Sequence, residues 1–402
     1  MQVWIQNPFD HLPEEGYRKQ RYRLMADAFA RAGHDVVYFT SDFSHAAKAP
    51  RRLAGEIVSP RTVFLPTPAY RGNVSFRRLW SHLVYAWRWY RMGKFSDFRI
   101  DEFSNGIRAF ENSQIRKFPS LIIASLPTIG GAFAALRLAR KCGAKVVIDV
   151  QDAWPETFFR LAPRGFGWLL RLALAPVKAV TRFLYRRADL VTGVCDRYRE
   201  LVGHDDYHRA YLGIEAGESS TSAGDGCSKV GCARAPSARS ARRYVYVGAL
   251  GRSYDLTPYL RKVEADESLK LDIAANGRIA TDCPRVRQHG YLDAAALKRL
   301  LAECDTGLIP MRDDSWVGVP NKFFDYAAAG LRIETSLGGE CAALAARWNR
   351  GELDFREELE ARAIYDNYVA VVMSHFRFSH TSGTDSLSLA PCPRADRSQP
   401  KL

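Results

Sequence analysis

The stretch SWVGVPNKFFDYAAAGLRIETSLGGE, residues 315–340, decides the fold of this chain. It reads as a loop, a short helix, a glycine stop, a strand and a second glycine turn. Pro320 fits the first helical position, where its missing N–H costs no hydrogen bond. Gly330 follows the last alanines, so we expect it to end the helix in the left-handed conformation. Residues 306–310 (TGLIP), just upstream, predict the strand that leads into this stretch.

The exposed side of that short helix carries a cation and a carboxylate. Lys322 and Asp325 are three positions apart and therefore share a helix face. A lysine just past a strand end can neutralise a phosphate, and an aspartate can accept hydrogen bonds from a ribose diol. Together they suit a phosphorylated, hydroxylated ligand. On these residues alone, a surface ion pair on an amphipathic helix is the simpler interpretation.

Composition narrows the classes of protein. A chain of 402 residues, 47% hydrophobic and 25% charged, predicts a soluble globular protein of about two domains. Its net charge of +14 predicts attraction to nucleic acid, acidic lipid or a phosphorylated substrate. We see neither a signal peptide nor an apolar run of about 18 residues, which favours a cytoplasmic location. The eight cysteines include no CxxC pair, which favours a reducing compartment and predicts no metal site.

The N-terminal half begins as a parallel sheet. Residues 3–6, 17–32 and 35–40 read as strand, helix and strand, a βαβ unit. Further strands are predicted at residues 120–125, 145–150, 188–194 and 211–215. A GxGxxG dinucleotide fingerprint is absent.

Polar residues follow several of these strands, where α/β folds collect their ligands. Glu14, Glu15 and Gly16 lie in the loop after the first strand, and His45 follows the second. His45 suits a base or a hydrogen-bond partner, and a solvated loop histidine is an equal alternative. Asp152 follows the strand 145–150 and could orient a sugar hydroxyl or exchange a proton. Capping the next helix is the commoner fate of such an aspartate.

Two segments, residues 76–95 and 160–187, mix aromatic and basic side chains. Tryptophan with arginine and lysine is what a bilayer interface selects, so we predict contact with an anionic membrane surface. Helices packed on their own domain, with cations in solvent, are the alternative. The predicted membrane-contact residues are Trp80, Trp87, Trp89, Arg77, Arg78, Arg88, Trp168, Arg171 and Lys178.

A low-complexity stretch separates two halves of similar pattern. Residues 216–241 are rich in Ser, Gly and Ala and predict a linker or a disordered insertion. The pattern then restarts with a strand at 243–247, followed by a glycine turn. Backbone N–H groups of such a turn can meet phosphate, although one GxxG is a weak signal. Residues 374–402 are Ser/Pro-rich and predict a disordered tail.

Several segments, in their order, resemble the retaining glycosyltransferases of family 4. The segments are RAGHDVVYFTSDFSH, VVIDVQDAWPE, ADLVTGVCDRYRELV, YLGIE, YVGALGRSYDL, HGYLDAAALKRLLAECDTGLIPM and VPNKFFDYAAAGL. The subset they look most like is the bacterial group that builds cell-surface polysaccharide and lipid-linked oligosaccharide. The resemblance implies the α/β GT-B architecture, two facing Rossmann-like domains with a cleft between them. Residues 1–215 would form the acceptor domain and residues 242–373 the nucleotide-sugar domain.

The resemblance also implies roles for single residues. The donor diphosphate would meet Gly248, Gly251 and Arg252, while Asp325 would hold the ribose and Lys322 would lie beside it. The loop of Glu14, Glu15 and Gly16, with Asp152 and His45, would face the reacting sugar as the acceptor-side and catalytic residues. Family members transfer with retention and generally need no metal. The implied partners are a nucleotide-sugar donor, a lipid-linked or polysaccharide acceptor and the inner face of the cell membrane, without nucleic acid.

Two departures from the family pattern stand out. The family often carries two glutamates with seven residues between them, and here Val317 and Asp325 occupy those positions. The closing helix that crosses back to the first domain is hard to find, and residues 354–373 are the best candidate. Three alternatives therefore stay open: a nucleotide-sugar 2-epimerase of the same architecture, a catalytically weak relative that binds sugar nucleotides, and a nucleic-acid binder.

Overall fold

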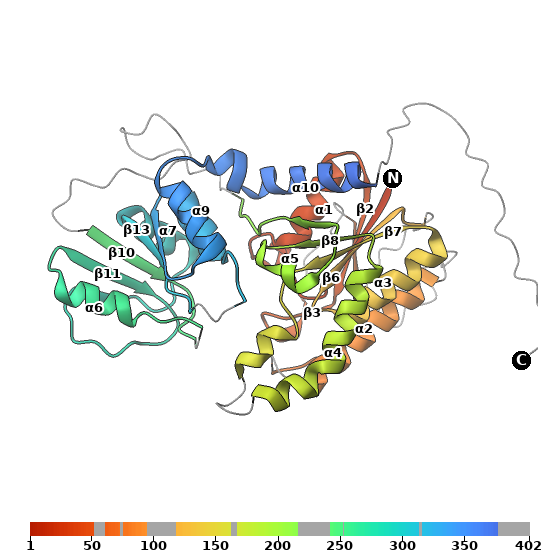
Figure 1. Cartoon of the computed structure of the whole chain (residues 1–402), viewed down its shortest axis with the longest axis horizontal. Coiled ribbons are helices and arrows are strands. Elements are labelled where there is room, and N and C mark those ends of the chain that lie inside the picture. Colours follow the sequence, from red (N-terminus) through yellow and green to blue (C-terminus); the bar gives the residue numbers. More distant parts are fainter. Residues whose placement is uncertain are drawn as a thin grey trace, which may run out of the picture.

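The computed structural model describes residues 1–51, 61–72, 75–94, 118–161, 167–215, 242–251, 253–312 and 316–376. These residues form two parallel β-sheets, each covered by helices (Figure 1). The predicted linker at 216–241, Arg252 and residues 377–402 of the predicted tail lie outside the described residues.

The first sheet has seven strands in the order β5-β2-β1-β6-β7-β8-β9, and all its strand pairs are parallel. Its strands are β1 (Gln2–Gln6), β2 (Asp35–Ser41), β5 (Arg61–Leu65), β6 (Leu121–Leu126), β7 (Lys145–Val150), β8 (Leu190–Gly193) and β9 (Tyr207–Arg209). Its helices are α1 (Arg21–Arg31), α2 (Phe76–Lys94), α3 (Ile129–Cys142), α4 (Gly167–Arg187) and α5 (Arg197–Val202). A two-stranded ribbon of β3 (Phe43–Ser44) and β4 (Ala49–Pro50) follows β2.

Side chains alternate between the two faces of the first sheet, so the core has one layer on each face. Val3 and Ile5 of β1 join the cluster under α1, whereas Trp4 joins the cluster under α2 and α3. Successive side chains of a strand point to opposite faces, so a sheet covered on both sides needs apolar residues at every position. The continuous apolar runs of the sequence therefore reflect two covered faces.

The second sheet has five parallel strands in the order β12-β11-β10-β13-β14. They are β10 (Arg242–Val247), β11 (Leu269–Ala274), β12 (Val286–Gln288), β13 (Thr306–Ile309) and β14 (Arg332–Thr335), with helices α6 (Thr257–Ala265), α7 (Ala294–Glu303), α8 (Asn321–Ala328) and α9 (Gly339–Asn349). The stretch at 315–340 supplies α8 and β14. Pro320 is the residue before α8 rather than its first residue, and Gly330 has the expected positive φ of 69°. The two Rossmann-like sheets confirm the predicted fold class.

The last helix returns to the first sheet. After a short π-helical turn (Phe355–Leu359), α10 (Ala361–His375) packs along α1, and Figure 1 shows it running across the top of that sheet. Arg31 of α1 pairs with Asp366 of α10 at 2.6 Å. Residues 361–375 therefore occupy the place of the closing helix expected at 354–373, and they extend into the predicted tail by two residues.

Some predicted elements differ from those observed. The strand expected at 211–215 is reduced to a single bridge between Ile214 and Glu360, and β9 upstream forms the sheet edge instead. The first helix starts at Arg21 rather than near residue 17. Its first turn is capped from a distance, because the Asp10 carboxylate accepts a hydrogen bond from Tyr22 N at 3.0 Å.

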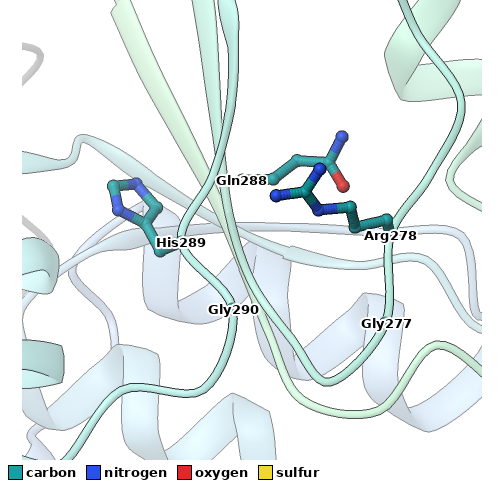
Figure 2. A pocket seen from close by; sticks show the side chains of 5 residues that line it. All are labelled: Gly277, Arg278, Gln288, His289 and Gly290. Atoms are coloured by element: carbon teal, nitrogen blue, oxygen red, sulfur yellow. The ribbon is translucent and has the colours of Figure 1, made fainter.

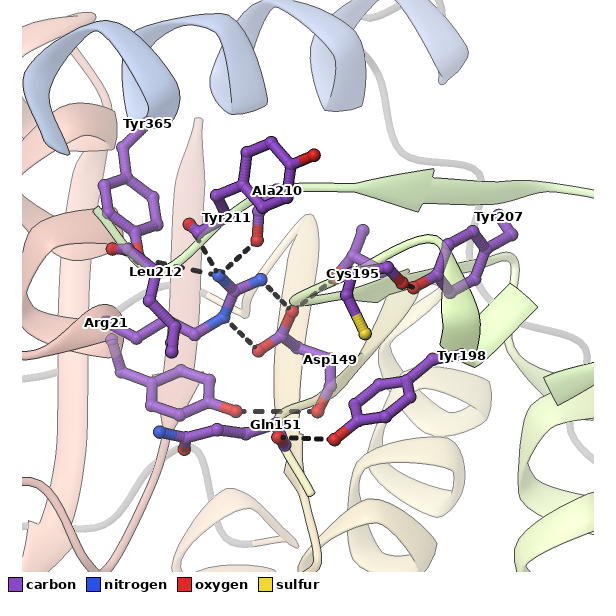
Figure 3. Close-up of polar contacts among 12 residues, drawn as sticks. Arg21, Asp149, Gln151, Cys195, Tyr198, Tyr207, Ala210, Tyr211, Leu212 and Tyr365 are labelled. Atoms are coloured by element: carbon purple, nitrogen blue, oxygen red, sulfur yellow. Dashed lines mark hydrogen bonds and ion pairs between the residues drawn. The ribbon is translucent and has the colours of Figure 1, made fainter. Parts of the chain in front are cut away.

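A buried ion pair joins α1 to the middle of the first sheet (Figure 3). Arg21 donates to both carboxylate oxygens of Asp149, each at 2.7 Å, and both side chains are fully buried. Thr192 donates to the same carboxylate at 2.6 Å, and Arg21 also donates to the Ala210 carbonyl at 2.7 Å. Tyr365 of α10 lies 3.5 Å from the guanidinium, so one arginine connects α1, the sheet and the returning helix.

Candidate functional site

The two domains contact each other through loops and helices that follow strand ends. Arg18, in the loop after β1, pairs with Asp325 of α8 at 2.5 Å. Asp196 N, in the turn after β8, donates to the Glu340 carboxylate of α9 at 2.8 Å, and Tyr211 donates to the same carboxylate at 2.8 Å. The carboxyl ends of parallel strands in α/β proteins carry their ligand sites, so both candidate half-sites lie at this junction.

On the second-sheet side, the structure brings Lys322 against the turn after β10. Gly248 has a φ of 128°, and a Cβ built on it would lie 2.6 Å from Lys322 Nζ. The ammonium donates to the Tyr254 hydroxyl at 3.1 Å and lies 4.3 Å from the centre of that ring. Glycine is therefore favoured at 248 by its backbone conformation, and a side chain there would push the lysine ammonium from the turn.

The structure gives fewer contacts for the other predicted donor residues. Gly251 lies exposed in the same turn, and Arg252 falls outside the described residues. Asp325 shares the α8 face with Lys322, but its carboxylate is taken by Arg18 of the first domain. Val317, at the position of the missing glutamate, packs partly buried against the core.

A hollow of about 350 Å³ lies at the ends of the neighbouring strands β11 and β12. It is lined by Gly277, Arg278, Gln288, His289 and Gly290, and Figure 2 shows the Arg278 side chain reaching toward Gln288. The Gln288 amide is fixed by two hydrogen bonds to the backbone of Ile279, at 2.9 and 2.8 Å. Sequence reasoning missed this hollow, because its lining comes from two turns rather than from one motif.

On the first-sheet side, the predicted acceptor loop is held by arginines. Glu15 forms a largely buried ion pair with Arg51 and also accepts from Leu12 N at 3.2 Å. Glu14 lies 3.3 Å from Arg23, and Gly16 ends the short 3-10 turn with a φ of 81°. These carboxylates therefore set the shape of the loop in this structure.

His45 lies in a cationic and aromatic setting. Its Nδ1 is 2.6 Å from the Tyr70 hydroxyl and 3.2 Å from Lys48 Nζ. Burial, followed by the charges of Lys48 and Arg78, lowers the pKa of His45 to about 4. The imidazole is therefore neutral at physiological pH and can exchange hydrogen bonds without carrying charge.

Asp152 lies in the turn after β7, as expected. Its side chain remains open to solvent, yet the surrounding protein raises the pKa of its carboxyl by desolvation, with Arg78 opposing that shift. Desolvation favours the protonated form, which is the direction that helps a carboxyl take part in proton exchange.

Arg78 is predicted from the sequence to contact the membrane, but in the structure its side chain lies in this site. Its guanidinium lies 5.1 Å from the centre of the Phe9 ring and 5.7 Å from that of Trp154, and its Nε is 3.3 Å from His82 Nε2. Sequence reasoning missed Phe9, His82 and Trp154. Two signals could have found His82 and Trp154: Arg78 and His82 are four apart on one helix, and Trp154 lies two residues after Asp152.

The remaining predicted membrane residues divide by helix face. Trp89 is fully buried in the core under α2, so its prediction is wrong: Tyr85 and Trp89, one turn apart, form the inner stripe of that helix. Trp80, Trp87 and Trp168 are more than half exposed, and Arg77 and Arg171 are also exposed. Arg88 donates to the Pro66 carbonyl, and Lys178 pairs with Glu156 at 2.9 Å.

The exposed apolar side chains of α2, α3 and α4 form what we call the aromatic face. These helices pack side by side on one face of the first sheet (Figure 1). Its apolar members are Phe76, Leu79, Trp80, Leu83, Trp87, Phe133, Trp168, Leu169, Leu172, Val180 and Phe183. Arginines lie over several of these rings, Arg91 over Trp87 at 4.9 Å and Arg137 over Phe133 at 4.7 Å.

Among the described residues, no helix combines the length and apolarity needed to cross a bilayer. Within the same ranges, no group of three or more His, Cys, Asp or Glu side chains is arranged to hold a metal ion.

Comparison with known proteins shows what parts of this chain resemble. Residues 19–210, just under half of the chain, match the glycosyl transferase 4-like domain. The fold is similar to the OtsA apo structure, with a TM-score of 0.51, 12% identity and coverage of 93% of this chain and 98% of that one. It is also similar to the catalytic domain of starch synthase IV from Arabidopsis thaliana bound to ADP and acarbose, with a TM-score of 0.51, 11% identity and coverage of 94% and 98%. A search of the curated proteins finds no match.

Proposed function

We propose that this chain, a glycosyltransferase by its N-terminal domain and with the GT-B fold, moves a sugar from a nucleotide-sugar to a lipid-linked or polysaccharide acceptor with retention. The proposed place of reaction is the cytoplasmic face of the cell membrane, with the protein bound peripherally and no metal required. The observation that carries the proposal is the approach of Lys322 to the Gly248 turn, in the domain whose α8 also contacts the first domain through Asp325 and Arg18.

The donor half-site would use charge rather than covalent chemistry. Backbone N–H groups of the Gly248–Gly251 turn, with Lys322 and Arg252, would stabilise the charge that develops on the leaving diphosphate. Asp325 would accept hydrogen bonds from the ribose once Arg18 releases it. The hollow beside Arg278 and Gln288 has the size and polar lining for the base, and a fold relative carries ADP.

The acceptor half-site would supply position and proton exchange. In a retaining transfer, the bond from the sugar C1 to the diphosphate breaks and the acceptor oxygen bonds C1 on the same face. The acceptor proton then passes to the departing diphosphate oxygen. Asp152 would orient the acceptor hydroxyl, neutral His45 would hold a neighbouring hydroxyl, and the loop of Glu14–Gly16 would wall the reacting sugar.

The aromatic face supports a membrane-bound acceptor. It combines exposed tryptophans and leucines with arginines on adjacent helices of the acceptor domain, which is the composition of an interfacial surface. Substituting Trp80, Trp87 and Trp168 together by alanine should abolish flotation with vesicles of acidic lipid. Substituting the exposed Tyr291 of the other domain should leave flotation unchanged. Equal flotation of both variants would contradict this part of the proposal.

Nucleotide binding tests the donor half-site directly. Thermal shifts with UDP-, GDP- and ADP-sugars should reveal one class of donor that stabilises the protein by about 2–4 kcal/mol at saturation. Asp325→Ala should lose that response without unfolding, because Asp325 is a partly exposed side chain. Asp366→Ala, which removes a different exposed arginine partner, is the matched control. No response to any nucleotide would overturn the proposal, and incubation with donor alone would distinguish transfer from 2-epimerisation.

A further inference from the structure

A cluster of cations and rings lies where the aromatic face meets the acceptor half-site. Arg78 and His82 come from the first turns of α2, Phe9 from the loop after β1, and Trp154 from the turn that carries Asp152. Phe9 also packs edge-on against His45 and His82, with ring centres 5.4 and 4.8 Å apart. Two loops and one helix thus contact the Arg78 guanidinium, and the loop of His45 packs against Phe9.

A second cation shares this cluster. Lys48 lies 3.2 Å from His45 Nδ1, and its ammonium is 5.2 Å from the centre of the Tyr70 ring. Burial and then the charge of Arg78 lower the pKa of Lys48, and the same charge contributes to lowering the pKa of His82 to about 3. In both groups the largest cause is burial, and the Arg78 charge is the second cause, which a bound anion would offset.

The position of the cluster restricts which anion fits. Phe76, Leu79 and Trp80 are on the same first turns of α2 as Arg78, yet they are exposed on the aromatic face. Asp152, the residue proposed to orient the acceptor hydroxyl, is near enough to Arg78 to oppose the lowering of its pKa by burial. An anion bound by Arg78 would therefore have apolar contacts on one side and the acceptor position on the other.

We propose that Arg78, assisted by Lys48, binds the phosphate or diphosphate that links the acceptor sugar to its lipid. The inference rests on the proposed function, because it names the chemistry of the acceptor. A guanidinium presents paired N–H donors that match phosphate oxygens, and its partly buried setting between rings strengthens the attraction to an anion. The lipid chain would continue onto the aromatic face, while the sugar would extend toward Asp152.

Binding of hexyl phosphate and inorganic pyrophosphate, measured by calorimetry in detergent-free buffer, tests this subsite. Arg78→Gln should weaken hexyl phosphate binding about tenfold or more, and Lys48→Gln should weaken it less. Arg77→Gln is the matched control, because Arg77 is the adjacent arginine and is exposed. It should bind hexyl phosphate as the wild type does and lose affinity only for vesicles containing phosphatidylglycerol.

The outcomes separate the subsite from the function on which it rests. Unchanged hexyl phosphate binding by Arg78→Gln, or equal loss in Arg77→Gln, would overturn the subsite even if nucleotide-sugars still stabilise the protein. If only Arg78→Gln loses hexyl phosphate binding and no nucleotide-sugar stabilises the protein, the phosphate site is supported and the transferase function is rejected. Arg78→Lys retains the charge and, if Arg78→Gln fails to fold, should show weakened but measurable binding. If Arg78→Lys and Lys48→Gln, as separate variants, both bind hexyl phosphate with wild-type affinity, the subsite is rejected.

Discussion

Two arginines three positions apart, Arg18 and Arg21, bind two aspartates in opposite ways. Arg21 makes a two-pronged contact with Asp149, both side chains are fully buried, and Thr192 also donates to that carboxylate. Arg18 makes one contact with Asp325 across the domain junction, and the two side chains are 53% and 31% exposed. The chemistry is the same, so the difference lies in solvent and in the number of supporting hydrogen bonds.

The difference separates a structural contact from an exchangeable one. A buried pair cannot lose one member without leaving a charge in a medium of low dielectric, which destabilises proteins by about 3–5 kcal/mol. An exposed pair contributes about 0–1 kcal/mol, since water replaces either partner. Arg21 is thus positioned to hold α1, the sheet and α10 together, whereas Arg18 can release Asp325 when a ligand offers better partners.

Breaking the buried pair should have the largest effect. Arg21→Met leaves Asp149 buried without its cation and should lower the free energy of unfolding by about 3–5 kcal/mol, measured by urea denaturation. The double variant Arg21→Met/Asp149→Leu removes both charges and should recover part of that loss. A loss below about 1 kcal/mol in the single variant would show that the pair is not what holds this layer together.

The architecture could be predicted from the sequence, but these two ion pairs could not. Strand, turn and helix patterns are local, so residues 315–340 could be read as α8 and β14, and the restart near residue 243 gave the second sheet. Arg21 and Asp149 are 128 positions apart, and Arg18 and Asp325 are 307 apart. Composition and spacing hold no information at such separations, because only the packed fold brings the partners together.

The same limit explains the mixed outcome for α2. The mixture of aromatic and basic residues correctly indicated exposed rings at Trp80 and Trp87, but it placed Trp89 and Arg78 with them. Trp89 points inward because of its helical phase, which periodicity could have shown. Arg78 is drawn into the site by Phe9 and Trp154, which come from distant loops, and no local pattern predicts that contact.

Within the described part of the chain, His82 is a buried titratable group without an acidic partner, and its substitution should have an effect between those of the two arginine pairs. His82 is held neutral, because burial and then Arg78 lower its pKa to about 3, below the ordinary value of 6.5. As pH falls below about 6.5 the unfolded chain takes up a proton that the folded protein refuses, so stability is lost between pH 6.5 and 3. His82→Gln keeps an acceptor for Arg78 and removes this titration. Between pH 7 and 5 it should lose less stability than the wild type, by on the order of 1 kcal/mol. Equal losses in urea titrations at both pH values would contradict the neutral imidazole.

Breaking the exposed pair should have the smallest effect on stability and a visible one on ligand binding. Arg18→Gln should change the free energy of unfolding by less than about 1 kcal/mol. If Arg18 competes with the ribose for Asp325, its removal should tighten nucleotide binding two- to fivefold, roughly the same free energy expressed as affinity. Arg31→Gln is the matched control, because Arg31 pairs with Asp366 at 2.6 Å with similar exposure and away from the junction. Weaker nucleotide binding in Arg18→Gln would instead indicate that Arg18 binds the donor from the opposite domain. The exposed arginine would then have a direct role in function, because it would stay at the junction and contact the ligand.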